Sequence, residues 1–138
     1  MPVPKRGNEK LPVTYIGVDE ARAFCADQGK RLPREEEWQH AGQGFESERV
    51  YPWPDQNVNT SAMMPRMQTG RRFEGPEAVD AHAPGSDSVF GVSDLLGNVW
   101  QMTDVYQDAH TSSVVLRGGS CYRPQGSPWY LLRPNFSR

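Results

Sequence analysis

Apolar positions at helical spacing mark the first regular stretch of the chain. Ala21, Phe24 and Cys25 fall at i, i+3 and i+4, so they share one face of a helix. Asp19 stands where a side chain caps a first turn, and Gly29 stands where a left-handed residue ends a helix. The pattern predicts a short helix between these two residues, with Cys25 as a core side chain.

A second short helix is predicted to begin near Pro33, because proline suits a first turn whose N–H groups lack helical partners. Trp38 and Ala41 form its buried stripe, and the glycines at 42 and 44 end it. Three consecutive glutamates, at 35–37, occupy its first turn, where the helix dipole favours negative charge. A metal or acid–base cluster is the alternative interpretation of these glutamates. The solvated first turn is the one we favour.

The rest of the chain shows little periodicity. Between residues 45 and 93, proline and glycine interrupt every pattern, but the aromatic residues indicate an ordered segment. An apolar run follows at 91–106, and residues 112–119 are typical of a strand that ends in a glycine turn. The sequence therefore predicts an α+β fold that is rich in loops, with two short helices near the N-terminus and few strands.

Length and charge narrow the possible classes. The 138 residues fit a single domain. The net charge of -2 argues against nucleic acid or an anionic membrane as partner, because both require a basic excess. No apolar run approaches the roughly 20 residues that cross a bilayer, and the N-terminus has no apolar signal-peptide region. We expect a soluble chain, and a cytoplasmic location is favoured although the compartment stays open.

Charge is unevenly distributed along the chain. Seven acidic residues and no Lys or Arg lie between Phe73 and Leu116, whereas four arginines and no acid follow Val114. One interpretation is that these two segments pair with each other. The alternative is that the acidic segment binds a hard cation through carboxylates and carbonyls.

Common catalytic signatures are absent from the sequence. It contains no HExxH, Walker loop or GxSxG, and its three histidines lack metal-type spacing. Its two cysteines, Cys25 and Cys121, make neither a disulfide framework nor a four-ligand zinc site. Cys121 follows a Gly-Gly-Ser turn and is either a buried, inert thiol, which we favour, or a reactive one.

Four strings, taken in order, resemble one known family. They are PVTYIGVDEARAFCADQGKRLPREEEWQHAGQG, YPWP, GVSDLLGNVWQMTD and LRGGS, and they extend from Pro12 to Ser120. Together they resemble the formylglycine-generating enzyme, or sulfatase-modifying factor, domain. The resemblance implies a C-type-lectin-like fold that aromatic packing holds together, often with calcium.

The resemblance also implies a partial copy. Residues 1–138 match a single domain whose relatives usually begin earlier and end later, so we expect it to be incomplete at both ends. A chain of this kind is expected to associate with itself or with a partner domain that completes the fold. The apolar stretch at 129–132 would make such an edge adhesive.

For catalysis the resemblance implies two copper-binding cysteines after the glycine turn. The matching positions hold Arg123 and Pro128, which cannot replace the soft thiolates that select Cu(I). This disfavours copper, and with it the conversion of a sulfatase cysteine to formylglycine. Cys121, which has no cysteine near it in the sequence, stays a candidate catalytic residue, with Arg123 and Trp129 as candidate substrate-binding residues.

For calcium the resemblance implies two sites. The positions that match the first are Asp94, Gly97, Val99 and Gln101. Gln101 keeps a carbonyl oxygen but removes one negative charge, which lowers affinity and keeps the geometry. The alternative role for Asp94 is a turn-capping aspartate.

The second calcium site matches at Asn57, Val58 and Phe73. Its acidic ligand position is Arg71, whose guanidinium repels calcium, so this site is expected to be degraded.

Two functions follow from the resemblance. One is a formylglycine-generating-enzyme-like domain of a non-haem, oxygen-using oxidase or sulfoxide synthase, which acts on a small molecule or a peptide. No iron-binding motif is present, so iron would have to come from another domain. The other is a catalytically inactive, lectin-like module that binds a ligand.

Overall fold

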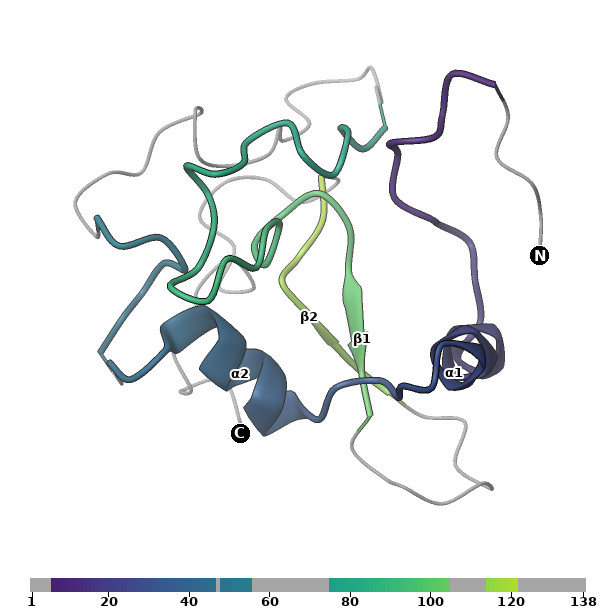
Figure 1. The fold of residues 1–138 in the computed structure, drawn as a ribbon, viewed down its shortest axis with the longest axis horizontal. Helices are drawn as coiled ribbons and strands as arrows, with labels where there is room; N and C mark the ends of the chain where they lie inside the picture. Colours follow the sequence, from purple (N-terminus) through teal and green to yellow (C-terminus); the bar gives the residue numbers. More distant parts are fainter. Residues whose placement is uncertain (1–5, 47, 56–74, 105–113, 122–138) are drawn as a thin grey trace.

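The computed structural model describes residues 6–46, 48–55, 75–104 and 114–121. Within them the elements follow in the order α1 (Val18–Asp27), α2 (Glu35–Gln43), β1 (Gln101–Thr103) and β2 (Val115–Arg117). In the view of Figure 1 the two strands lie between the helices, and long loops cover the upper part of the molecule. This confirms a loop-rich α+β chain with two early helices. No helix in the described ranges is long and apolar enough to cross a membrane.

Helix α1 differs from the prediction at its beginning. Gly17 is the N-cap residue, and its N–H donates to the Glu20 carboxylate at 2.8 Å. The predicted cap by Asp19 is therefore wrong, because the cap lies two residues earlier and the acid three positions after it reaches back. Gly29 ends the helix with φ 66°, as the sequence indicates.

The apolar face of α1 is less buried than its pattern predicts. Ala21 is buried, but Phe24 is 47% exposed and Cys25 is only partly covered, so the prediction of Cys25 as a core side chain is wrong. The neighbouring Arg22 makes the long-range contact instead. Its guanidinium donates to both carboxylate oxygens of Asp104, at 2.6 and 3.0 Å, and so ties α1 to the residue after β1.

Helix α2 contributes Trp38 to the core cluster. The indole of Trp38 is 4% exposed and packs with Trp53, Leu95 and Leu96. The guanidinium carbon of Arg117, from β2, lies 4.6 Å from the centre of the Trp38 ring, a cation–π distance. The predicted buried stripe of this helix is confirmed at Trp38.

The glutamates of α2 are used in ion pairs. Glu37 accepts two hydrogen bonds from Arg31, at 2.7 and 2.8 Å, and these bonds lower its pKa to about 2. Glu35 accepts a hydrogen bond from Arg117 at 2.6 Å. Within the described residues no group of three or more His, Cys, Asp or Glu side chains is arranged to hold a metal. The first turn of α2 is thus a set of helix-stabilising contacts.

Strands β1 and β2 form a two-stranded antiparallel sheet. Their register pairs Gln101 with Arg117, Met102 with Leu116 and Thr103 with Val115. Thr103 is fully buried, and its hydroxyl donates to the carbonyl of Val115 at 2.9 Å. A side-chain hydrogen bond therefore reinforces a sheet that is too short to be stable by itself.

Two acids of the central segment pair with cations from the first part of the chain. Lys10 bonds to Asp80 and Arg22 to Asp104, whereas Arg117 pairs with Glu35. For Arg117 the expected pairing with the acidic segment is therefore wrong. The other arginines of the C-terminal segment lie outside the described residues.

The loop after α2 closes around a buried arginine. The guanidinium of Arg49 donates to the carbonyls of Gln43 and Trp53, each at 3.1 Å, and pairs with Glu46 at 2.9 Å. These bonds satisfy a cation that is removed from water. They also fix the segment that carries Trp53, whose ring stacks on Tyr51 with centroids 4.9 Å apart.

The tightest backbone approach is at Gly118, directly after β2. Its φ is +85°, and a Cβ built there would lie 2.6 Å from the carbonyl oxygen of Leu95. Gly29 has a similar φ of +66° but nothing within 4 Å of its Cβ position. The two glycines separate the effect of backbone conformation from that of space.

We predict that Gly118→Ala lowers the free energy of unfolding by about 3 to 5 kcal/mol, because the new methyl group forces the Leu95 backbone away. Gly29→Ala is the matched control and should lose about 1 kcal/mol, the cost of the left-handed conformation alone. Urea unfolding of the two variants measures the difference. Equal losses of unfolding free energy in the two variants would contradict the close approach of Gly118 to the Leu95 backbone.

Candidate functional site

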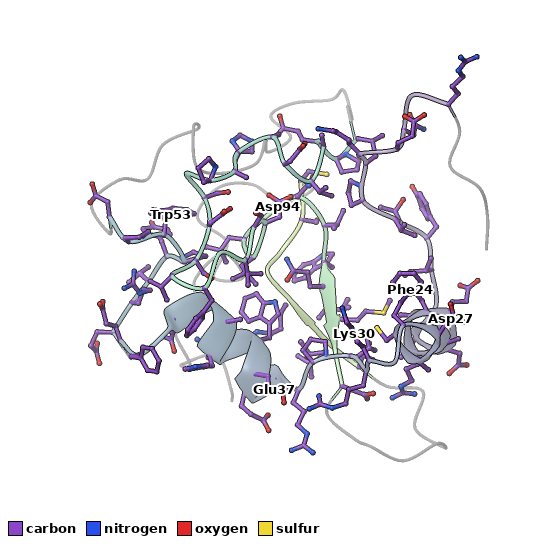
Figure 2. The ribbon with its side chains drawn as sticks, in the orientation of Figure 1. Phe24, Asp27, Lys30, Glu37, Trp53 and Asp94 are labelled. Carbon is purple, nitrogen blue, oxygen red and sulfur yellow. The ribbon has the colours of Figure 1, made fainter. Side chains whose placement is uncertain are left out.

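Three of the predicted calcium positions, Asp94, Gly97 and Val99, lie in one turn that is built on left-handed backbone, and Gln101 follows it as the first residue of β1. Asp94, Gly97 and Asn98 have φ values of 55°, 79° and 60°. These are residue types that tolerate this conformation, so the sequence itself favours the turn. Between them, Leu95 and Leu96 enter the core next to Trp38. In Figure 2 Asp94 lies among the loops near the middle of the view, between Trp53 on one side and Phe24 of α1 on the other.

Asn98 holds the inside of the turn. Its side chain is 2% exposed, accepts from the N–H of Glu77 at 2.9 Å and donates to the carbonyl of the same residue at 3.2 Å. It also donates to the Asp94 carboxylate at 3.3 Å. The amide of Asn98 therefore acts like a section of backbone that joins the turn to the segment around Glu77.

Gln101 closes the turn from the other side. Its Oε1 accepts from the indole Nε1–H of Trp38 at 2.6 Å. Its Nε2 donates a hydrogen bond to the backbone carbonyl of Asp94. One side-chain amide thus connects α2, the first residue of β1 and the start of the turn.

The glycine turn after β2 packs against the same structure. The N–H of Gly97 donates to the carbonyl of Gly118 at 2.7 Å, and the N–H of Cys121 donates to the carbonyl of Asn98 at 2.9 Å. Cys121 is 7% exposed, and both cysteines of the sequence carry thiols. The candidate catalytic residue is therefore a buried side chain that lies against the predicted calcium turn.

The surroundings of Asp94 are acidic. Burial raises the pKa of its carboxyl, and the charges of Glu77 and Asp87 raise it further, while the Asn98 hydrogen bond and His82 lower it. His82 lies 2.8 Å from the Glu77 carboxylate. Asp87 accepts from the hydroxyl of Ser93 at 2.6 Å. The net effect is that negative charge on Asp94 is disfavoured here.

These contacts fit a calcium ion only in part. Asp94 supplies one carboxylate, and the carbonyls of Gly97 and Val99 belong to the same turn, as the resemblance implies. Gln101, however, directs its oxygen to Trp38 and its N–H toward the Asp94 carbonyl. A calcium site prefers an oxygen at that point.

The other predicted site residues lie outside the described residues. These are Asn57, Val58 and Phe73 of the second calcium site, and Arg123 and Trp129 of the substrate site. Their predicted roles stay predictions.

Two residues of this site were missed from the sequence. Asn98 lies within the GNVW string, and an Asn after a Gly in a turn is a signal for left-handed backbone. Trp38 was expected in the core, but no pattern indicates that its indole bonds to a residue 63 positions away.

A family model supports the resemblance over nearly the whole chain. The model described as Sulfatase-modifying factor enzyme 1-like domain matches residues 2–137. The search also shows the limits of the match, because the chain spans two fifths or less of the relatives described below.

Individual relatives fall into three named groups. The chain is 41% identical, over 81% of its length and 40% of the relative's, to an "Inactive C-alpha-formylglycine-generating enzyme 2" of Bos taurus. It is 32% identical to a "Formylglycine-generating enzyme" of Mus musculus, over 73% of the chain and 29% of that protein. It is 35% identical to a "Hercynine oxygenase" of Mycobacterium tuberculosis, over 67% of the chain and 21% of that protein. With the motifs and the family match, these similarities show that the chain belongs to the formylglycine-generating enzyme, or sulfatase-modifying factor, domain family.

Proposed function

We propose that this chain is a non-catalytic member of its family, a binding module that does not make formylglycine. The observation that carries the proposal is the state of Cys121. Its side chain is buried, and its backbone N–H is held by the carbonyl of Asn98. A thiol that acts as a nucleophile or a metal ligand needs access and an environment that stabilises the thiolate.

The positions of the cysteines support this proposal. Cu(I) sites are built from soft ligands, chiefly paired thiolates. Cys25 lies on α1 and Cys121 follows the glycine turn, so the two cysteines are 96 positions apart in the sequence. The positions that the resemblance assigns to the copper ligands hold Arg123 and Pro128, and neither side chain is a soft donor.

The names of the relatives also support the proposal. Relatives from Bos taurus and Mus musculus, 41% and 38% identical to the chain, carry the word "Inactive" in their names. The relatives named as formylglycine-generating enzymes in Mus musculus and Bos taurus are 32% and 30% identical. We infer that the chain shares the inactive character of the first pair.

We also propose that the described elements belong to a C-type-lectin-like fold, a scaffold in which loops display a binding surface. Two helices, a short antiparallel sheet and turns joined by side-chain hydrogen bonds support this architecture. The ligand would be a small molecule or a peptide, with Arg123 and Trp129 as its proposed contacts. Residues 1–138 would then act as one domain that associates with a partner domain or a second copy.

A second candidate function rests on one relative. The 35% identity to a hercynine oxygenase supports a role as the accessory domain of a larger oxygen-using enzyme. In that case another domain supplies iron, and the chain contributes binding surface only.

We predict that the chain produces no formylglycine from a peptide with a sulfatase motif, in the presence of copper, oxygen and a reductant. The physical reason is the missing thiolate pair. Mass spectrometry of the peptide measures the conversion, and the mouse formylglycine-generating enzyme serves as positive control. Turnover that disappears in Cys121→Ser would contradict the proposal.

We further predict that Cys121 is protected from thiol reagents in the folded chain. Cys25 is the matched control, because it is partly exposed on α1. Under native conditions iodoacetamide should label Cys25 at least tenfold faster than Cys121, and the difference should vanish in urea. Faster labelling of Cys121 would indicate an accessible, activated thiol and would remove the basis of the proposal.

A further inference from the structure

We propose that the side-chain amide of Gln101 takes the place of a metal ion in the turn 94–98, so that this domain closes the turn without calcium. The resemblance implies that an acid at position 101 belongs to a calcium site, so a carboxylate there would convert the turn into one. The inference is independent of catalysis, since it concerns only how the turn is held together.

The orientation of the amide is fixed by Trp38. An indole N–H is a donor and has no acceptor lone pair, so the group that faces it at 2.6 Å must be the amide oxygen of Gln101. The amide nitrogen therefore faces the carbonyl of Asp94, to which it donates a hydrogen bond. A flipped amide would place a donor against the indole donor and an acceptor against the carbonyl.

This orientation opposes a cation at the same point. The two hydrogens on Nε2 carry partial positive charge and lie next to the carbonyl oxygen of Asp94. A calcium ion coordinated by that side of residue 101 would meet these hydrogens instead of an oxygen. The N–H of Gln101 thus gives the Asp94 carbonyl the partner that a cation would otherwise provide.

Glutamate has the same shape as glutamine but lacks the donor. With Glu at position 101, one carboxylate oxygen could still accept from Trp38, and the other would lie against the Asp94 carbonyl. Two acceptors in contact are unfavourable in a partly buried turn. With the Asp94 carboxylate, which belongs to the same turn, they would offer an all-oxygen donor set of the kind that calcium prefers.

Other contacts of the turn are also made by groups of the protein. Asn98 donates to the Asp94 carboxylate at 3.3 Å. The N–H of Gly97 donates to Gly118 at 2.7 Å, and the carbonyl of Asn98 accepts from Cys121 at 2.9 Å. Each of these bonds fixes one end of the turn with groups of the protein itself.

The test compares the full chain with its Gln101→Glu and Gln101→Met variants, each melted with a chelator and with excess calcium. The wild-type Tm should be the same in both conditions. The Gln101→Glu chain should melt roughly 5 to 10 °C lower with the chelator and recover most of the loss in calcium. Gln101→Met, the matched control of similar size without either hydrogen bond, should be lowered in both conditions.

Calorimetric titration of the wild-type chain with calcium provides an independent readout. No saturable binding is expected. Binding that is lost in Asp94→Ala would overturn the proposal, even if Gln101→Glu failed to fold. A Gln101→Glu chain that is as stable as wild type in the chelator, or that gains no stability from calcium, would overturn it as well.

Discussion

A chain of two hydrogen bonds through one amide, from the Trp38 indole through Gln101 to the Asp94 carbonyl, joins the parts of this domain that lie far apart in sequence. Trp38 anchors α2 in the core, and Arg117 of β2 stacks on the same ring. Through Gln101, the core tryptophan also sets the start of the turn that carries the buried leucines. The position of the sheet, of α2 and of the turn therefore depends on one indole ring and the amide that it orients.

The fold relies on side-chain bonds because its backbone ladders are short. Each strand has three residues. The side chain of Asn98 accepts a hydrogen bond from the backbone of Glu77, as a neighbouring strand would. Arg49 donates to backbone carbonyls around the loop after α2, and Arg22 of α1 donates to Asp104. These bonds hold the described loops in place, and Cys121 packs against the turn. A buried thiol is poorly placed for redox chemistry.

Much of the architecture could be predicted from the sequence. The presence of α2, the burial of Trp38, the strand before the glycine turn and the family all follow from local pattern and motif. The predicted start of α2 near Pro33 is wrong by two residues, because Arg34 is the N-cap and Glu35 the first helical residue. Three features could not be predicted, for physical reasons. The N-cap of α1 is Gly17, which has no capping side chain to mark it in the sequence, and its backbone angles set the start of the helix. The exposure of Phe24 depends on what packs against α1. The Arg22–Asp104 pair joins residues 82 positions apart, which no local pattern records. For the site, motif matching brought Asp94 and Gln101 together, but the direction of the amide depends on Trp38.

Hydrogen exchange at the Trp38 indole reports the bond to Gln101 itself, because the exchanging proton is the one that the bond holds. By NMR in the presence of a chelator, the Trp38 Nε1–H should exchange only through global unfolding, with protection that matches the most protected backbone amides. The amide of Gly91, which donates within a local turn to Ser88, provides an internal comparison and should exchange faster. An indole proton that exchanges as fast as that of a solvent-exposed tryptophan, or that gains protection only when calcium is added, would contradict the account.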